Sequence, residues 1–227
     1  MSTINSVPKK KNKTRIASSK QDAVRLLFIL AEIGEAPSSD APEGAVLYIE
    51  GQAKLQALDF WLRNPDYLAN ELLNEYQKDK LKINLFYKAK EILNSDELVT
   101  RNFPMLRYLF GAFEALDNSF SILSCYKFAT FDKISIKNKT KIYKYYLYKE
   151  GLEAAIKIVK EYPDLSWYQE RCRLIKSIFG DLPGSKLKEM QHQQSDYHNT
   201  SYHSPITNIK DKVQKRLLEI KKNDKLD

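Results

Sequence analysis

Glycine is scarce in this chain, which holds only 7 glycines among its 227 residues. Average proteins contain about 7% glycine. Because glycine is the residue that readily adopts positive φ, a chain with so little of it has few sites for tight turns. This argues against a many-turned β-sandwich or barrel and favours helices. With 43% hydrophobic and 29% charged residues, the chain can bury a core and is not disordered throughout.

The apolar stretches and the cysteines indicate the cellular compartment in which the protein resides. No apolar run reaches the roughly 18–20 residues needed to span a bilayer. The first residues lack the apolar core of a signal peptide. The two cysteines, Cys125 and Cys172, make neither a metal-binding pattern nor a disulfide framework. We therefore expect a reduced, cytoplasmic protein with no membrane partner, and both cysteines are predicted to lie in the core.

The net charge of +8 is distributed unevenly along the chain. Residues 1–20 carry +6 and residues 21–126 carry −6. Residues 127–149 return to +6, residues 150–209 carry −1 and residues 210–227 carry +3. The pattern predicts a mildly acidic body with a basic arm, a basic middle segment and a basic tail.

Apolar residues recur at helical spacing over most of the body. We expect helices at 19–33, 52–63, 66–77, 85–93, 103–116, 152–162, 166–179, 187–190 and 210–222. Ser19 with Asp22 and Ser166 with Gln169 are spaced as capping boxes. Asn64 is predicted to cap a helix whose first turn holds Pro65.

Residues 120–149 differ, because β-branched and aromatic residues dominate there. We predict a β-hairpin with a lysine-rich tip at 135–140, with a helix as the alternative, and a short strand at 46–49. A basic hairpin can lie along a phosphate backbone, as can a basic arm. The ordinary alternative for both is a solvated charge run. The candidate nucleic-acid contacts are Lys133, Lys137, Lys139, Lys141 and Lys144 on the hairpin and Lys9, Lys10, Lys11 and Lys13 on the arm.

Catalytic patterns are weak in this sequence. The segment Gly180–Lys186 has the wrong spacing for a phosphate loop and reads as a turn between helices. All three histidines fall in the polar stretch 191–208, which we interpret as linker or disorder. Paired acids such as Glu32 and Glu35 are predicted to lie at caps or on solvated faces. The sequence therefore predicts no catalytic residue, no metal site and no cofactor, and the protein is not expected to be an enzyme.

The last helix carries a thin apolar stripe of Val213, Leu217 and Ile220 on a charged surface. The stripe is too narrow for a core but suits docking on a partner.

Four segments, taken in order, are similar to one family of proteins. The segment Lys54–Leu68, which follows the apolar run Arg25–Ile33, resembles a signature of the small middle, or accessory, component of bacterial ABC three-component systems, which include Lamassu-type defence systems. Tyr146–Ala155 resembles the step out of the wing in that family. Glu170–Lys188 resembles its helix-turn-helix. The resemblance covers residues 24–190, so the basic arm and the tail fall outside it, and the wing region is unusually rich in lysine.

The resemblance implies a mainly α fold with a small β-hairpin, in which a winged-helix-like core carries a C-terminal helical extension. The chain would divide into a basic flexible arm at 1–18, the core at 19–149, the extension at 150–190 and a polar linker with an amphipathic tail helix at 191–227. The implied role is a non-catalytic accessory subunit that bridges an SMC-like coiled-coil ATPase and a nuclease-type effector in an anti-phage or anti-plasmid complex. Double-stranded DNA is a further expected partner. The expected partner-binding residues are Trp167, Arg171, Leu187, Val213, Leu217 and Ile220.

Two alternatives belong to other classes. The chain could be a free-standing winged-helix DNA-binding regulator or antitoxin, but its candidate recognition helices, 52–63 and 66–77, are apolar and acidic, which argues against reading of base edges. An enzyme of unrecognised type is the second alternative.

Overall fold

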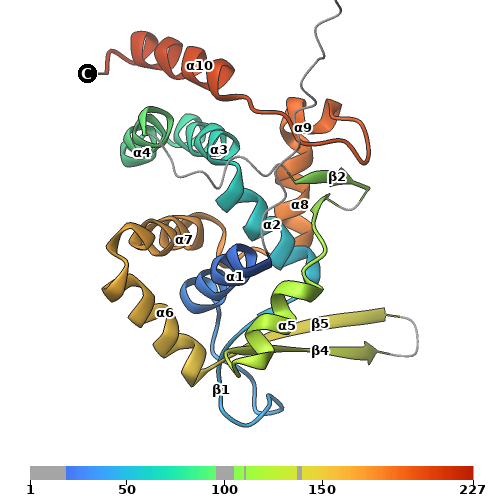
Figure 1. Ribbon diagram of the computed structural model, residues 1–227. Coiled ribbons are helices and arrows are strands. Elements are labelled where there is room, and N and C mark those ends of the chain that lie inside the picture. The colour runs from blue at the N-terminus through green and yellow to red at the C-terminus, as the bar shows by residue number, and fades with distance from the viewer. Residues whose placement is uncertain (1–18, 96–104, 110, 137–139, 227) are drawn as a thin grey trace, which may run out of the picture.

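Helix α1 (Ser19–Ile33) is apolar nearly all round and lies inside the protein. It packs against α5 (Asp117–Cys125), α6 (Lys149–Glu161) and α7 (Ser166–Phe179) (Figure 1). A helix with so much apolar surface needs neighbours on several sides, and these three provide them. The structure, a computed structural model, describes residues 19–95, 105–109, 111–136 and 140–226.

The chain is mainly helical (63%), with a small three-stranded antiparallel sheet and a separate hairpin. The predicted helices 19–33, 52–63, 66–77, 85–93, 166–179 and 210–222 are confirmed within a few residues at each end. The other helices of the described residues are α2 (Gln52–Arg63), α3 (Pro65–Lys78), α4 (Ile83–Asn94), α8 (Gly184–Gln193), α9 (Ser195–Asn199) and α10 (Lys210–Asn223), with a 3₁₀ turn at Pro163–Leu165.

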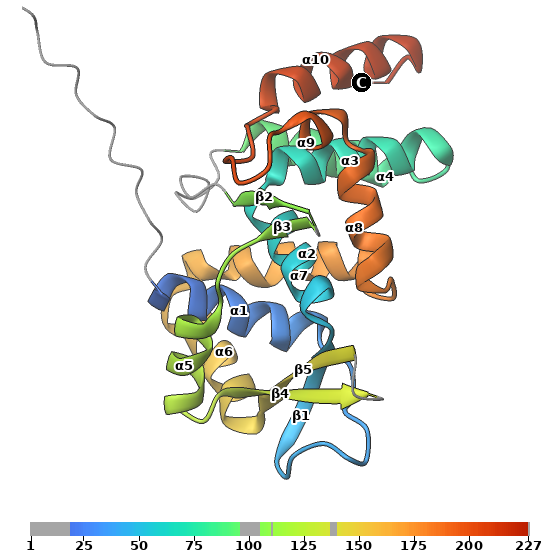
Figure 2. The same cartoon turned by 90° about the vertical axis from the view of Figure 1, so that its right-hand side faces the viewer.

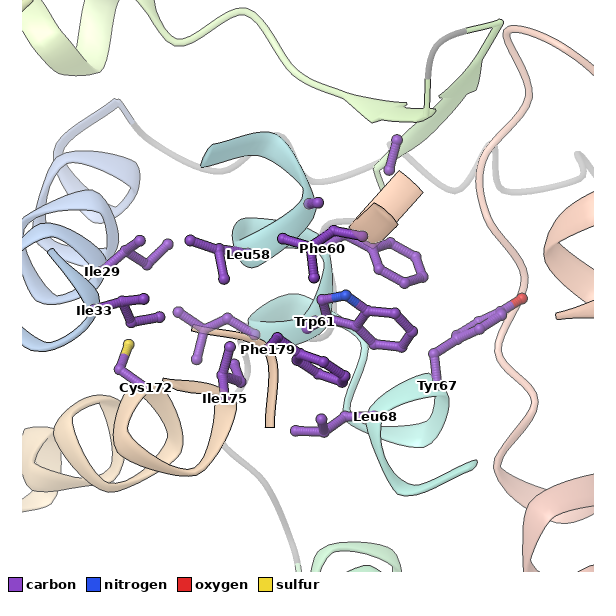
Figure 3. Packing of buried hydrophobic residues seen from close by; sticks show 14 of the residues in the cluster. Ile29, Ile33, Leu58, Phe60, Trp61, Tyr67, Leu68, Cys172, Ile175 and Phe179 are labelled. Carbon is purple, nitrogen blue, oxygen red and sulfur yellow. The ribbon is translucent and has the colours of Figure 1, made fainter. Parts of the chain in front are cut away.

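The core is centred on α2, in which every residue from Lys54 to Arg63 is buried. The ring of Trp61 stacks on Phe179 of α7 at 5.0 Å between centroids and meets the edge of Phe60 at the same distance (Figure 3). Phe60 in turn contacts Tyr67 of α3 and Tyr197 of α9. This aromatic group joins α2, α3, α7 and α9 into one continuous core.

The three-stranded sheet contains β1 (Ala45–Glu50), β5 (Thr140–Tyr148) and β4 (Ala129–Ile136), in that spatial order. The predicted short strand and the predicted β-hairpin are thereby confirmed. Strands β4 and β5 stay in register from Ala129 opposite Leu147 to Ile136 opposite Thr140. The predicted turn tip, Asn138 and Lys139, lies outside the described residues.

The predicted helix at 103–116 is wrong where the structure describes it. Residues Leu106–Tyr108 form β2 and residues Gly111–Phe113 form β3, which pair as a short hairpin. Gly111 has φ +119°, a conformation that favours glycine and ends any helix. The outer edge of β2 pairs with the C-terminal tail, because Arg107 N–H donates to the Ser204 carbonyl at 3.0 Å.

Helix α5 begins at Asp117, where the sequence predicted a helix to end. Ile122 and Cys125, assigned to the hairpin by their β-friendly side chains, lie on α5 instead. The expectation that both cysteines are buried is half wrong, since Cys125 is exposed and Cys172 is buried. Burial raises the pKa of the Cys172 thiol.

The predicted helix caps also differ. Ser166 makes no capping bond, and the Gln169 amide donates instead to Glu32 Oε1 of α1 at 2.7 Å. Pro65 lies in the first turn of α3 as predicted, but Asn64 Nδ2 donates backwards to the Phe60 carbonyl at 2.8 Å. Asn64 occupies the N-cap position of α3 as predicted and also the C-cap position of α2, but its side chain makes no capping bond to α3.

The interpretation of residues 191–208 as linker or disorder is wrong. The stretch completes α8, forms α9 and then runs against the body in extended form, with Tyr197 fully buried. Asp66 fixes its end by accepting the Ile209 N–H at 2.6 Å, and the Tyr67 hydroxyl donates to the Thr207 carbonyl at 3.1 Å. Such long-range bonds to backbone groups cannot be read from local composition.

The stripe on α10 is also not a free docking surface. Val213, Leu217 and Ile220 are 1%, 6% and 4% exposed, because α10 packs across α3 and α4 (Figure 1). The stripe is narrow, but the two helices beneath it supply the rest of an apolar interface.

Neighbouring leucines on α10 provide a matched test of this packing. Leu217 is 6% exposed and Leu218 is 63% exposed. We expect Leu217→Ala to lower the free energy of unfolding by about 2–3 kcal/mol through loss of buried contacts. Leu218→Ala should change it by less than about 0.5 kcal/mol. Urea unfolding monitored by circular dichroism measures both, and equal losses would show that α10 is not packed on the body.

Candidate nucleic-acid interface

The β4–β5 hairpin extends beyond the helices that cover its base (Figure 1). At the base, Phe120 of α5 packs on Tyr145 of β5, with 4.9 Å between ring centroids. Further out, Phe131 is 37% exposed and Lys133 is exposed. The outer part of this sheet face is therefore open to solvent.

This open face carries a row of aromatic rings with a lysine beside it. The rings of Tyr143 and Tyr145 stack with 6.2 Å between their centroids. The centroid of the Phe131 ring lies 6.2 Å from that of Tyr143 and 5.9 Å from that of Tyr145. The ammonium of Lys133 lies 5.3 Å from the centroid of the Tyr143 ring. The face of an aromatic ring attracts a cation, so this contact holds the Lys133 charge at a defined place on the exposed face. The face offers a positive charge and flat apolar surfaces together, which suits contact with a polyanion.

Lys144 lies on the opposite face of the hairpin, because side chains alternate along a strand. Its neighbours in register are Asp132 on β4 and Glu50 on β1, and its ammonium contacts Asp40 Oδ2 at 3.2 Å. The hydrogen bond to Asp40 raises the pKa of Lys144. Its charge is locally compensated, so Lys133 and Lys144 do not form one basic patch.

The other predicted contacts are described only in part. Lys137, Lys139 and the arm lysines Lys9, Lys10, Lys11 and Lys13 lie outside the described residues. The backbone of Lys141 pairs with that of Ser135 near the outer end of the hairpin.

The expected partner-binding residues on α7 and α8 are less exposed than the sequence suggested. Leu187 is fully buried and Arg171 is 8% exposed, so the expectation of exposed amphipathic pieces near 167–190 is wrong for both. Arg171 lies 5.2 Å from the ring of Trp167, which is only partly buried. Both residues line a groove of about 380 Å³ between α4 and α7. Trp167 is the member of the predicted set that retains accessible surface there.

A buried group of charges went unrecognised in the sequence. Arg25 of α1 donates to Asp59 of α2, which is fully buried, and to Asp22 Oδ1 at 2.7 Å. Arg63 of α2 contacts Glu114, and its nearest nitrogen lies 3.6 Å from Asp59. Burial alone lowers the pKa of Arg25, but the attraction and hydrogen bonds of Asp59 and Asp22 raise it above its ordinary value. Charged residues at positions that the helical pattern assigns to the core were the available signal.

The two acids at and just after the end of α1 have basic partners, and the Glu35 side chain is exposed as predicted whereas that of Glu32 is largely covered. Glu32 accepts from Arg173 Nε at 2.8 Å, and Glu35 pairs with Lys54 at 2.7 Å. They join α1 to α7 and α2, so their role in the fold is structural.

Among the described residues, no cluster of three or more histidine, cysteine or acidic side chains has a geometry that could hold a metal ion. In the same part of the chain, no helix combines the length and apolarity needed to cross a membrane. No protein-family model, no curated protein and no solved structure matches this chain.

Two exposed lysines, one on the hairpin and one on α6, give a matched test of nucleic-acid contact. We expect Lys133→Ala to weaken binding of a labelled DNA duplex several-fold and to reduce the slope of log K against log salt by about one, the value for one lost phosphate contact. Lys157→Ala, on the surface of α6 where Lys157 contacts Glu161 at 3.7 Å, should change neither quantity. Fluorescence anisotropy over a salt series measures both. Identical binding by the two variants would remove Lys133 from the interface.

Proposed function

We propose that this chain is a non-catalytic accessory subunit of a bacterial anti-phage or anti-plasmid complex of the Lamassu type. In this proposal it bridges an SMC-like ATPase and a nuclease effector, and its hairpin contacts the backbone of DNA. ATP hydrolysis and DNA cleavage belong to the partners. The observation that carries the proposal is the solvent-open face of the β4–β5 hairpin, which extends beyond the helices at its base and carries Lys133 over the ring of Tyr143.

We also infer a winged-helix-like arrangement in the first part of the chain. The supporting features are the order of helices before a β4–β5 hairpin and the return of β1 to pair with β5. The hairpin corresponds to the wing, whose expected ligand is a phosphate backbone. Helices α6 and α7 then form the extension.

The α4–α7 groove is the surface that best suits a protein partner. It contains both charges and an aromatic ring, since Lys88, Glu91, Arg173 and Trp167 line it. Aromatic and arginine side chains are enriched where proteins meet. Because α10 covers α3 and α4, the groove replaces the α10 stripe as the expected contact with the ATPase.

A free-standing regulator is the second candidate, and burial argues against it. A recognition helix must present side chains to base edges in the major groove. In α2 the ten residues from Lys54 to Arg63 are all buried, and α3 is largely buried too. Neither helix can enter a groove without unfolding the core.

Size-exclusion chromatography with a co-encoded SMC-like ATPase tests the subunit proposal. We expect the two chains to elute as one complex, and Trp167→Ala to weaken that complex while leaving the far-ultraviolet circular dichroism spectrum unchanged. Tyr162→Ala, at a 60% exposed position outside the groove, is the matched aromatic control. A chain that stays monomeric beside the ATPase, or that binds one promoter sequence tightly by itself, would contradict the proposal.

A further inference from the structure

Arg107 of β2 is a buried arginine without a carboxylate partner among the described residues. Arg107 is 7% exposed, and no ion pair joins its guanidinium to any described acidic side chain. Arg25 and Arg63, which are equally buried, each contact acidic side chains. Burying a charge is costly unless a counter-charge and hydrogen bonds accompany it. Arg107 therefore differs from Arg25 and Arg63.

The surroundings of the Arg107 guanidinium satisfy it only in part. One terminal nitrogen donates to the Thr200 carbonyl, and the group lies 4.6 Å from the ring of Tyr202 and 5.7 Å from that of Tyr197. Its Nε is buried and has no hydrogen-bond partner in the described chain. Two aromatic rings and one carbonyl carry no formal negative charge, so the described residues leave the guanidinium without a counter-charge.

Three more buried polar atoms nearby have no hydrogen-bond partner in the part of the chain that the structure describes. They are Gln191 Nε2, His192 Nε2 and Tyr197 Oη. Gln191 is 1% exposed and Tyr197 is fully buried. The rings of His192 and Tyr197 lie 5.3 Å apart.

This group of residues lies at the short β2–β3 hairpin, which carries Arg107 and contacts Gln191. Gln191 lies against Gly111, where a Cβ atom would come within 3.2 Å of its Oε1. Gly111 pairs with Tyr108, the residue next to Arg107. Burial, with smaller contributions from Lys188 and Arg107, lowers the pKa of His192 and favours its neutral form.

A small anion would satisfy this set of groups together. The guanidinium Nε, the Gln191 amide and the Tyr197 hydroxyl are hydrogen-bond donors, and the neutral imidazole can be one. Buried polar groups in proteins are almost always paired, and several unpaired donors around one charge indicate a missing acceptor. Phosphate offers several acceptor oxygens and binds arginine through paired hydrogen bonds.

We propose that the junction of β2 with α8 and α9 binds the phosphate group of a small ligand, either inorganic phosphate or a mononucleotide. The polar groups are buried, which favours a small ligand over a duplex. Tyr202 is 51% exposed and lies beside the guanidinium, so the ligand would enter the site next to this residue. Gly111 also lines an adjoining pocket of about 460 Å³ with Tyr108 and Phe113, which has room for a nucleoside. The proposal is independent of DNA contact at the β4–β5 hairpin.

Thermal unfolding of the full chain tests this site, with chloride at equal ionic strength as the reference. We expect about 10 mM inorganic phosphate or adenosine monophosphate to raise the midpoint by about 2–4 °C. Arg107→Gln and Gln191→Leu should lose most of that shift. Tyr197→Phe should lose part of it without being less stable than the parent chain in chloride, because it removes an unpaired hydroxyl.

Tyr67→Phe is the matched control, since the Tyr67 hydroxyl has a partner in the Thr207 carbonyl. It should lower the midpoint in chloride and keep the full phosphate shift. A parent chain that does not respond to phosphate or nucleotide would overturn the proposal. So would a full shift in Arg107→Gln and Tyr197→Phe, or a shift produced by a short oligonucleotide alone.

Discussion

The ion pair between Arg25 and Asp59 is the interaction on which the rest of the structure depends. It joins α1 to α2 where Asp59 is fully buried, and Arg63 and Glu114 extend it toward the segment before α5. Desolvating these charges is costly, and the cost is offset only while all partners stay in place. The group therefore tolerates one arrangement of α1, α2 and the chain that leads into α5.

The elements that meet at this junction also position the two candidate sites. On one side, α1 and α5 hold the base of the sheet, so the outer hairpin with Lys133 projects from a fixed support. On the other side, Phe60, which lies next to Trp61 (Figure 3), contacts Tyr197 of α9, and Tyr197 lies beside Arg107. Figure 2 shows the β2–β3 hairpin above the β4–β5 hairpin on one side of the molecule. A phosphate ligand and a nucleic acid would thus approach the same face.

Local pattern predicted the strongly periodic helices, such as α1 and α7, and the β4–β5 hairpin. It failed where distant segments decide the structure. The stretch from Leu106 to Phe113 is apolar enough for a helix, but Gly111 and pairing with residue 204 make it a hairpin. The polar tail looked like linker because its anchors, Asp66 and Tyr67, lie far away in sequence. The face that each hairpin lysine occupies depends on strand register, and the Asp40 partner of Lys144 comes from a loop. The local sequence around Arg107 gave no signal, because its lack of an acidic partner among the described residues depends on how distant segments fold around it.

A double-mutant cycle on Arg25 and Asp59 tests the central claim most directly. Arg25→Met and Asp59→Asn should each lower the free energy of unfolding by about 3–5 kcal/mol, since each removes the main partner of a buried charge. The double variant should lose little more than either single variant, which corresponds to a coupling energy of several kcal/mol. Losses that add, with coupling near zero, would contradict the account and show that the two helices are held together by apolar packing alone.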